Sequence, residues 1–72
     1  MIKAGTNFEC IVDTCGMTKD GRFINIYKGD IVTKVKNTFS DIIHLRDMYM
    51  LRSSGVLLDI PMYAIANKFK EI

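Results

Sequence analysis

The chain has no tryptophan, one proline and one histidine among its 72 residues, and these scarcities limit the functions open to it. Its two cysteines, Cys10 and Cys15, are far fewer than the even sets that brace small secreted domains. They could pair only if the chain doubled back between them, so we expect no disulfide. Structural zinc sites present paired ligands such as Cys-x-x-Cys, and Cys10, Cys15 and His44 match that pattern poorly. We therefore predict no metal site and no cofactor.

Long apolar runs and a strong charge of one sign are also missing. No run approaches the roughly 18 apolar residues that span a bilayer. The first ten residues lack the apolar stretch of a secretory signal. Ten basic and eight acidic residues give a net charge of +2, which is too small to demand nucleic acid or a membrane surface. We predict a cytoplasmic protein without a membrane partner.

Groups arranged for catalysis are absent from the sequence pattern as well. Asp41 and Asp47 flank one extended run, where six positions correspond to about 20 Å, too far for shared acid–base work. Cys10 with His44 would need a third group to orient the imidazole and an electropositive site to activate the thiol. Neither residue has such neighbours in the sequence. We predict no catalytic residues and a protein that is not an enzyme.

The composition that remains is that of one small globular domain covering residues 1–72. Hydrophobic residues make up 49 % and charged residues 25 %, which is too apolar for disorder. Short runs rich in β-branched and aromatic residues alternate in polarity, which predicts strands. These runs are residues 6–13, 22–27, 31–36, 42–47 and 56–60, with 48–52 as a continuation or a further strand. Residues 14–21 read as a loop or irregular hairpin with an Asp20-Gly21 turn.

The region around Pro61 predicts a change of structure. Proline has no amide hydrogen to give to a ladder, so strand pairing should stop there. Residues 62–69 fit one helical turn better than a strand, and residues 68–72 could then close the sheet. Five or six short strands spaced by about 8–12 residues are typical of a small barrel or sandwich.

Two stretches resemble the Src-homology-3-like barrel family. "YKGDIVTKV" (residues 27–35) is similar to the Lys-Gly-Asp corner that opens that family's second strand. "GVLLDIPMYAIA" (residues 55–66) is similar to its late strand, apolar-Pro segment and helical turn, with Tyr63 one position early. The resemblance implies an all-β, five- to six-stranded barrel with one short helical turn near the C-terminus. The pattern is also loosely similar to small barrel proteins encoded by bacteriophages.

The resemblance does not extend to the family's best-known ligand. Members that bind proline-rich peptides use a tyrosine-rich first motif and tandem tryptophans, and "NFECIVDT" is not that motif. The Lys-Gly-Asp corner itself reads as a structural turn. Gly29 can supply a positive φ, and Asp30 can accept hydrogen bonds from nearby backbone amides. It lacks the longer glycine-rich run of a phosphate loop.

Surplus apolar residues on the predicted strands suggest a binding surface, because a thin barrel cannot bury both faces of each strand. We predict a non-enzymatic protein-binding module that occupies part of a larger protein. If the phage-like similarity holds, the partner is a bacterial host protein that is inhibited or redirected in the host cytoplasm. A homodimer is a further alternative. The residues expected to bind are Ile24, Ile26, Met48, Tyr49 and Arg52.

The alternative function is nucleic-acid binding through a basic surface, as small barrels often bind single strands. It would use Lys34, Lys36, Arg46, Lys68 and Lys70. The competing interpretation is that these lysines protect sheet edges from aggregation. Nucleic-acid binding predicts an affinity that falls steeply with salt, whereas edge protection predicts no binding.

Overall fold

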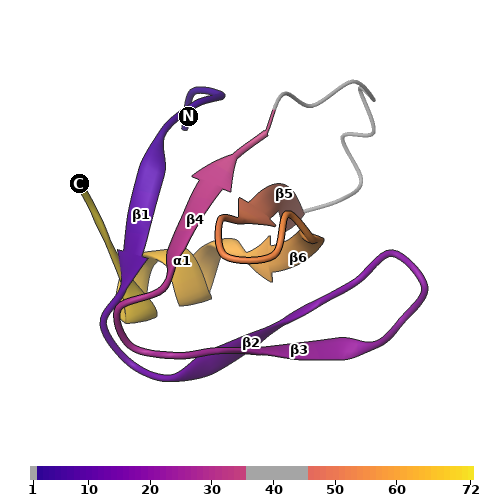
Figure 1. The fold of residues 1–72 in the computed structure, drawn as a ribbon. Coiled ribbons are helices and arrows are strands. Elements are labelled where there is room, and N and C mark those ends of the chain that lie inside the picture. Colours follow the sequence, from indigo (N-terminus) through magenta and orange to yellow (C-terminus); the bar gives the residue numbers. More distant parts are fainter. Residues whose placement is uncertain (1, 36–45) are drawn as a thin grey trace.

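The computed structural model describes residues 2–35 and 46–72, and within them seven strands and one helix follow one another (Figure 1). Strands are formed where β-branched and aromatic residues alternate with polar ones. The elements are β1 (Asn7–Cys10), β2 (Thr14–Met17), β3 (Phe23–Ile26), β4 (Ile31–Lys34), β5 (Arg46–Leu51), β6 (Leu57–Pro61), α1 (Met62–Lys68) and β7 (Phe69–Glu71).

All strand pairs in the described residues are antiparallel, in the sheet order β3-β2-β6-β5-β4-β1-β7. The mainly β architecture with a short helix near the C-terminus is therefore confirmed. The predicted closed barrel of five or six strands is wrong, because the sheet is open and has seven. The sheet is open because its end strands, β3 and β7, do not pair with each other among the described residues. Residues 14–17 add a strand, β2, which joins β6 through a single residue pair, Met17 with Asp59.

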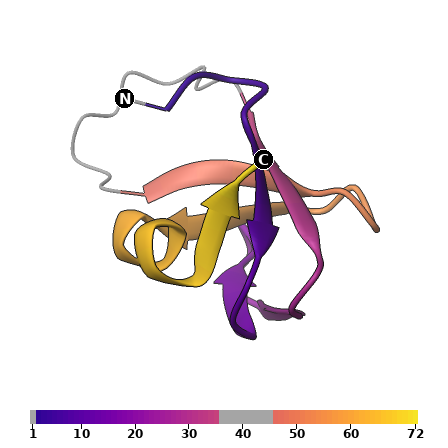
Figure 2. The same ribbon diagram turned by 90° about the vertical axis from the view of Figure 1, so that its left-hand side faces the viewer.

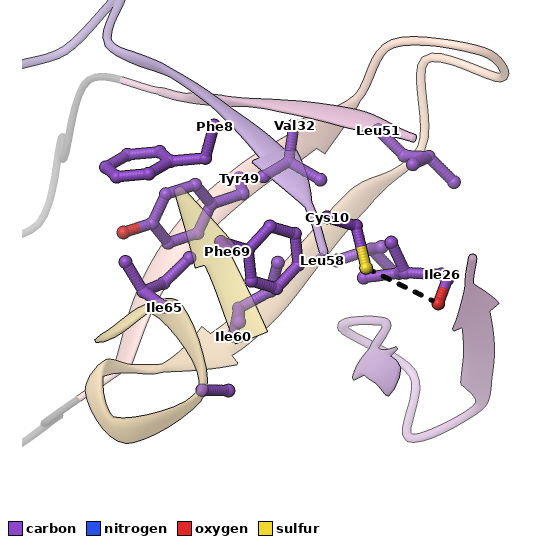
Figure 3. Close-up of a cluster of buried hydrophobic side chains, with 11 residues drawn as sticks. Phe8, Cys10, Ile26, Val32, Tyr49, Leu51, Leu58, Ile60, Ile65 and Phe69 are labelled. Atoms are coloured by element: carbon purple, nitrogen blue, oxygen red, sulfur yellow. Dashed lines mark hydrogen bonds between the residues drawn. The ribbon is translucent and has the colours of Figure 1, made fainter. Parts of the chain in front are cut away.

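Helix α1 lies beside β6 and β7 (Figure 2), and its Ala64 and Ile65 belong to the buried core. Side chains alternate between the two faces of each strand, and this alternation decides which residues belong to the core. On β6, Leu58 and Ile60 are fully buried, whereas Leu57, the first residue of the strand, is 48 % exposed. The Phe8 and Tyr49 rings meet edge to face, with centroids 6.0 Å apart (Figure 3). The buried hydrophobic residues are Phe8, Cys10, Ile26, Val32, Tyr49, Leu51, Leu58, Ile60, Ala64, Ile65 and Phe69.

The Lys-Gly-Asp corner is the structural turn that its sequence predicts. Gly29 has φ 97°, a left-handed conformation that favours glycine. The Tyr27 amide donates to Asp30 Oδ2 at 2.9 Å, and the Lys28 amide donates to Asp13 Oδ1 at 2.7 Å. Both carboxylates are thus occupied in holding backbone, and the corner joins β3 to β4.

Strand pairing continues through Pro61, one residue further than the sequence predicts. It is the last residue of β6, in register with Arg46, and α1 starts directly after it. Proline is tolerated there because its fixed φ, here −68°, suits a strand end that leads into a helix. The helix has seven residues, which is about two turns rather than the predicted one. It then gives way to β7, which pairs with β1 as the expected final strand (Figure 2).

The hairpin β2–β3 projects from the rest of the sheet (Figure 1), and a glycine sets how closely its base approaches β6. A Cβ on Gly16 would lie 3.0 Å from Leu58 Cβ and 3.2 Å from Leu58 Cδ1. Any larger side chain at this position would therefore push the hairpin away from β6. The close approach places the outer face of the hairpin next to the start of α1.

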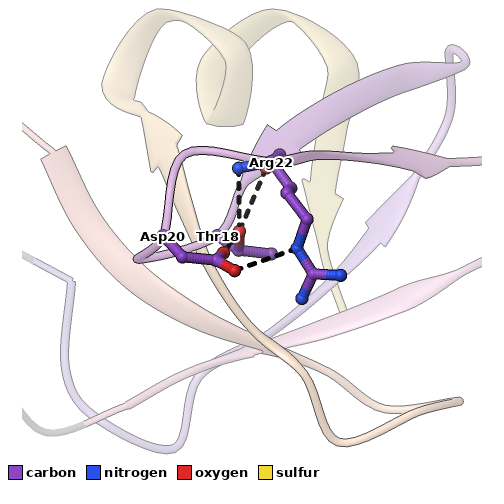
Figure 4. Close-up of polar contacts among 3 residues, drawn as sticks. All are labelled: Thr18, Asp20 and Arg22. Atoms are coloured by element: carbon purple, nitrogen blue, oxygen red, sulfur yellow. Dashed lines mark hydrogen bonds and ion pairs between the residues drawn. The ribbon is translucent and has the colours of Figure 1, made fainter.

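Three side chains and one glycine hold the far end of the hairpin (Figure 4). The Thr18 hydroxyl donates to Asp20 Oδ1, and the Arg22 amide donates to Thr18 Oγ1 at 3.0 Å. Arg22 Nε lies 3.0 Å from Asp20 Oδ2 in an exposed ion pair. Gly21 has φ 89°, as expected for the second residue of an Asp-Gly turn.

The hydrogen bond from the Thr18 hydroxyl lowers the pKa of Asp20, and the positive charge of Arg22 lowers it further. A carboxyl whose pKa is lower in the folded chain stabilises the hairpin above its ordinary pKa of about 3.9. That contribution is lost as the pH falls through the lowered value. We expect the Thr18 and Arg22 amide resonances of the wild type to titrate with a midpoint below about 3.9, and Asp20→Asn to remove that transition. A wild-type midpoint at the ordinary value would contradict the role given to Thr18.

Candidate protein-binding groove

A groove of about 270 Å³ lies between hairpin β2–β3, the end of β6 and α1. The single pairing of β2 with β6 brings the hairpin and β6 together. The residues that line the groove are Thr14, Cys15, Gly16 and Met17 of β2, Phe23 of β3, Asp59 and Pro61 of β6, and Tyr63, Ala64 and Lys68 of α1.

Two exposed aromatic side chains stand on the two sides of the groove. Phe23 is 72 % exposed and Tyr63 is 69 % exposed. Phe23 lies opposite Met17 in the hairpin register, on the face away from buried Ile26. Tyr63 precedes the buried pair Ala64 and Ile65 on α1 and therefore falls on the outer side of the helix. Large exposed aromatic residues that share one groove are typical of an interaction site.

Charged groups of both signs accompany these aromatic residues. Asp59 alternates with buried Leu58 and Ile60, so its carboxylate faces away from the core and into the groove. Lys68, the last residue of α1, is half-buried and also lines the groove. Apolar walls with a few polar groups can take up one large side chain and fix the direction of the segment that carries it.

The groove is small, and its lining contains one thiol, Cys15, and one carboxylate, Asp59. Its volume falls below the roughly 300–1,000 Å³ of pockets for small molecules. Among the side chains that the structure describes, residues 2–35 and 48–72, no three of His, Cys, Asp or Glu are placed to hold a metal ion. His44, the only histidine, lies outside the described residues.

Two of the residues predicted to bind protein are in the core, which corrects the sequence prediction. Ile26 and Tyr49 are fully buried. Residues 22–27 carry large apolar groups on both faces, so alternation alone does not show which face is internal. The fold buries Ile26 and leaves Phe23 and Tyr27 outside, at 72 % and 56 % exposure. Tyr49 is held by its edge-to-face contact with Phe8.

The other three predicted contact residues are not gathered into one surface. Ile24 is half-buried and packs against the core. Met48, also half-buried, lies on β5 opposite Asp59 and so stands one strand from the groove. Arg52 is exposed at the turn between β5 and β6, where Nη2 donates to Asn7 Oδ1 at 3.0 Å. None of the five residues predicted to bind protein lines the groove.

The residues proposed for nucleic-acid binding are similarly dispersed where they are described. Lys34 is buried, a correction to its assignment as a surface contact: its Nζ donates to the Val35 carbonyl at 3.0 Å. The ammonium also lies 5.9 Å from the centroid of the Tyr49 ring, because the long stem packs on apolar neighbours. Lys68 lines the groove and Lys70 is exposed on β7. Lys36 and the side chain of Arg46 lie outside the described part.

Cys10 has the surroundings of a packing residue, and its thiol is 1 % exposed as part of the core (Figure 3). Its Sγ donates to the Val12 carbonyl at 3.0 Å and to the Ile26 carbonyl at 3.8 Å. Burial raises the pKa of the Cys10 thiol, and the negative charge of Asp13 adds to that effect. A raised pKa suppresses the thiolate and argues against a nucleophilic role. Cys15, by contrast, is a free and exposed thiol in the groove.

This difference predicts the order in which the two thiols react. With a maleimide at neutral pH, we expect one equivalent to react quickly at Cys15 and the second only on the timescale of unfolding. Cys15→Ser should remove the fast phase, and Cys10→Ser should leave it. Fast labelling of Cys10 in folded Cys15→Ser protein, followed by mass spectrometry, would show that Cys10 is accessible and refute its burial.

Across residues 2–35 and 46–72, the structure contains no helix of the length and apolarity that crossing a membrane requires. Comparisons with protein-family models, with curated proteins and with solved structures find no match to this chain. The functional argument therefore rests on the groove itself.

Proposed function

We propose that the chain is a non-enzymatic protein-binding module that holds an extended segment of a larger protein in the groove. The observation that carries the proposal is the pair Phe23 and Tyr63, two strongly exposed aromatic residues from distant parts of the sequence that line one groove. Exposed aromatic side chains supply much of the binding energy at protein interfaces. Their proximity depends on the docking of hairpin β2–β3 beside α1.

The chemistry of the groove favours a particular kind of segment. Phe23, Met17 and Pro61 offer an apolar surface that suits one large apolar side chain. The Asp59 carboxylate suits a neighbouring Lys or Arg of the partner and disfavours phosphate, so it supports a peptide over a nucleic acid. Of the described residues of the basic-surface alternative, Lys34 is buried, Lys68 lines the groove and Lys70 lies on β7, which favours the protein-binding proposal over one basic surface.

The resemblance to Src-homology-3-like proteins also stays a proposal. We take the chain to be an open variant of that fold, and the Gly29-Asp30 corner and the Pro61-to-α1 junction support this. The loose similarity to bacteriophage barrel proteins leads us to propose a bacterial host protein as the partner, bound in the cytoplasm, with inhibition or redirection as the effect.

Capture from a bacterial lysate tests the proposal. Immobilised wild type is compared with Tyr63→Ala, and with Ile72→Ala, which removes an exposed apolar side chain outside the groove lining. We expect one protein, held in stoichiometric amount at high salt and after nuclease, to be lost with Tyr63→Ala and kept with Ile72→Ala. Equal capture by Tyr63→Ala, or recovery of nucleic acid alone, would overturn the proposal.

A further inference from the structure

Strand β3 is an unprotected edge of the sheet. Among the described strands it is hydrogen-bonded to β2 alone, and it lies at one end of the strand order. Natural edge strands usually carry charges or proline that discourage pairing with another chain. The opposite edge, β7, has Lys70 and Glu71, whereas the four residues of β3 contain neither charge nor proline.

The backbone of β3 presents hydrogen-bonding groups to this open side. The Thr18 amide donates to the Arg22 carbonyl at 2.7 Å, which extends the β2–β3 ladder by one pair. Hydrogen-bonded pairs alternate along an antiparallel ladder, so Ile24 and Ile26 are the next residues that bond to β2. The amide and carbonyl groups of Phe23 and Asn25 between them therefore point away from β2.

The sequence of this edge reads nearly the same in both directions. Residues 23–27 are Phe-Ile-Asn-Ile-Tyr, which is an aromatic residue, Ile, Asn, Ile and an aromatic residue about a centre at Asn25. A two-fold axis at that centre would place Asn25 opposite Asn25 of a second copy. It would also place Phe23 opposite Tyr27 of that copy. Such symmetry is what an interface between identical surfaces requires.

The outer face of β3 is suited to these cross-strand pairs. Phe23 and Tyr27 are 72 % and 56 % exposed, and Asn25 between them is exposed on the same side. Asn25 Nδ2 donates to Tyr27 Oη at 3.3 Å, which shows that the two side chains share that face. Aromatic pairs directly across antiparallel strands are among the favourable ones. We propose that the protein self-associates through β3, which pairs antiparallel with β3 of a second copy about an axis at Asn25.

The geometry also sets the strength of this association. The Tyr27 amide already donates to Asp30 Oδ2, and the Tyr27 carbonyl accepts from the Asp30 amide. The ladder between copies is thus centred on the two reciprocal Asn25 bonds. Arg22 would face Lys28 of the other copy, and its ion pair with Asp20 reduces that repulsion. A short ladder with two aromatic pairs gives a weak, concentration-dependent dimer.

Analytical ultracentrifugation from micromolar to millimolar protein tests the proposal. The wild type should shift from monomer to dimer within this range. Asn25→Asp sets two carboxylates against each other at the axis, so it should remain monomeric at neutral pH and dimerise again in mild acid. Leu57→Asp adds the same charge at an exposed residue away from β3 and should dimerise like the wild type.

A second variant tests the register. Opposed residues of a hydrogen-bonded pair have Cα atoms about 5.5 Å apart, which suits a disulfide. In a Cys15→Ser background, Asn25→Cys should form a covalent dimer on mild oxidation, and Phe23→Cys should form it much more slowly. A wild type that is monomeric throughout, or equal association of Asn25→Asp and wild type, would overturn the inference. Loss of the dimer in Tyr63→Ala would assign self-association to the groove instead of β3. The proposal that the groove binds another protein is tested separately, by capture from the lysate.

Discussion

Leu58→Ala is expected to unfold most of the protein at 37 °C. Leu58 is fully buried on β6, and Gly16 of the hairpin lies against it. Removing a buried leucine side chain costs about 2–5 kcal/mol, because transfer energy is lost and a cavity remains. The hydrophobic core of a domain below about 70–80 residues rarely contributes more than about 3–5 kcal/mol to the free energy of unfolding. The substitution therefore removes most of the free energy of unfolding.

Leu57→Ala is the matched control, since it deletes the same atoms from the neighbouring residue of the same strand. Leu57 is 48 % exposed on the opposite face of β6, so we expect a loss within about 0.5 kcal/mol. Urea denaturation followed by circular dichroism measures both variants. Similar losses for the two would show that the inward and outward faces of β6 are assigned incorrectly.

Gly16→Val is expected to destabilise the protein by about 1–3 kcal/mol through overpacking. The first added carbon would lie 3.0 Å from Leu58 Cβ, and the Asp59 carbonyl is 3.5 Å away on the same side. Leu58 Cβ is bonded directly to the backbone of β6, so it cannot rotate away as the end of a flexible side chain would. Because β2 joins β6 through one residue pair, we expect the hairpin to separate locally from β6.

Cys15→Val controls for the added bulk, because Cys15 is exposed on the other face of β2. Its effect on stability should stay within about 0.5 kcal/mol. Hydrogen exchange of the β2 and β3 amides would report the local separation in Gly16→Val. Unchanged stability and exchange in that variant would contradict the close packing of the hairpin on β6, and with it the geometry of the groove.

Local features of the fold could be predicted from the sequence because short-range chemistry determines them. Gly29 needs its positive φ and Asp30 binds the amide next to it, whatever the rest of the chain does. Pro61 marks the end of a strand and a helix start for the same local reason. Strand β2 was predicted only as part of a loop or irregular hairpin, because Thr14–Met17 has few apolar residues and takes its extended form from pairing with β3.

Long-range features could not be predicted in this way. The sheet is open because its end strands β3 and β7, which are distant in the sequence, are not paired with each other in the described residues, and no local sequence pattern records that. The core position of Ile26 could not be told from its alternation, since Phe23 and Tyr27 make the other face equally apolar. The groove joins Phe23 to Tyr63 only through tertiary docking. The available signal was one large aromatic residue near the start of a predicted strand, Phe23, and another just after Pro61, Tyr63.

The central claim is that the groove lined by Phe23 and Tyr63 binds a protein segment. The most direct measurement is the affinity of the captured partner for wild type, Tyr63→Ala and Ile72→Ala by isothermal titration calorimetry. An aromatic hot spot contributes about 2 kcal/mol or more, so Tyr63→Ala should weaken binding roughly 30-fold or more. Ile72→Ala should bind as the wild type does. Equal affinity of Tyr63→Ala and wild type would contradict the account.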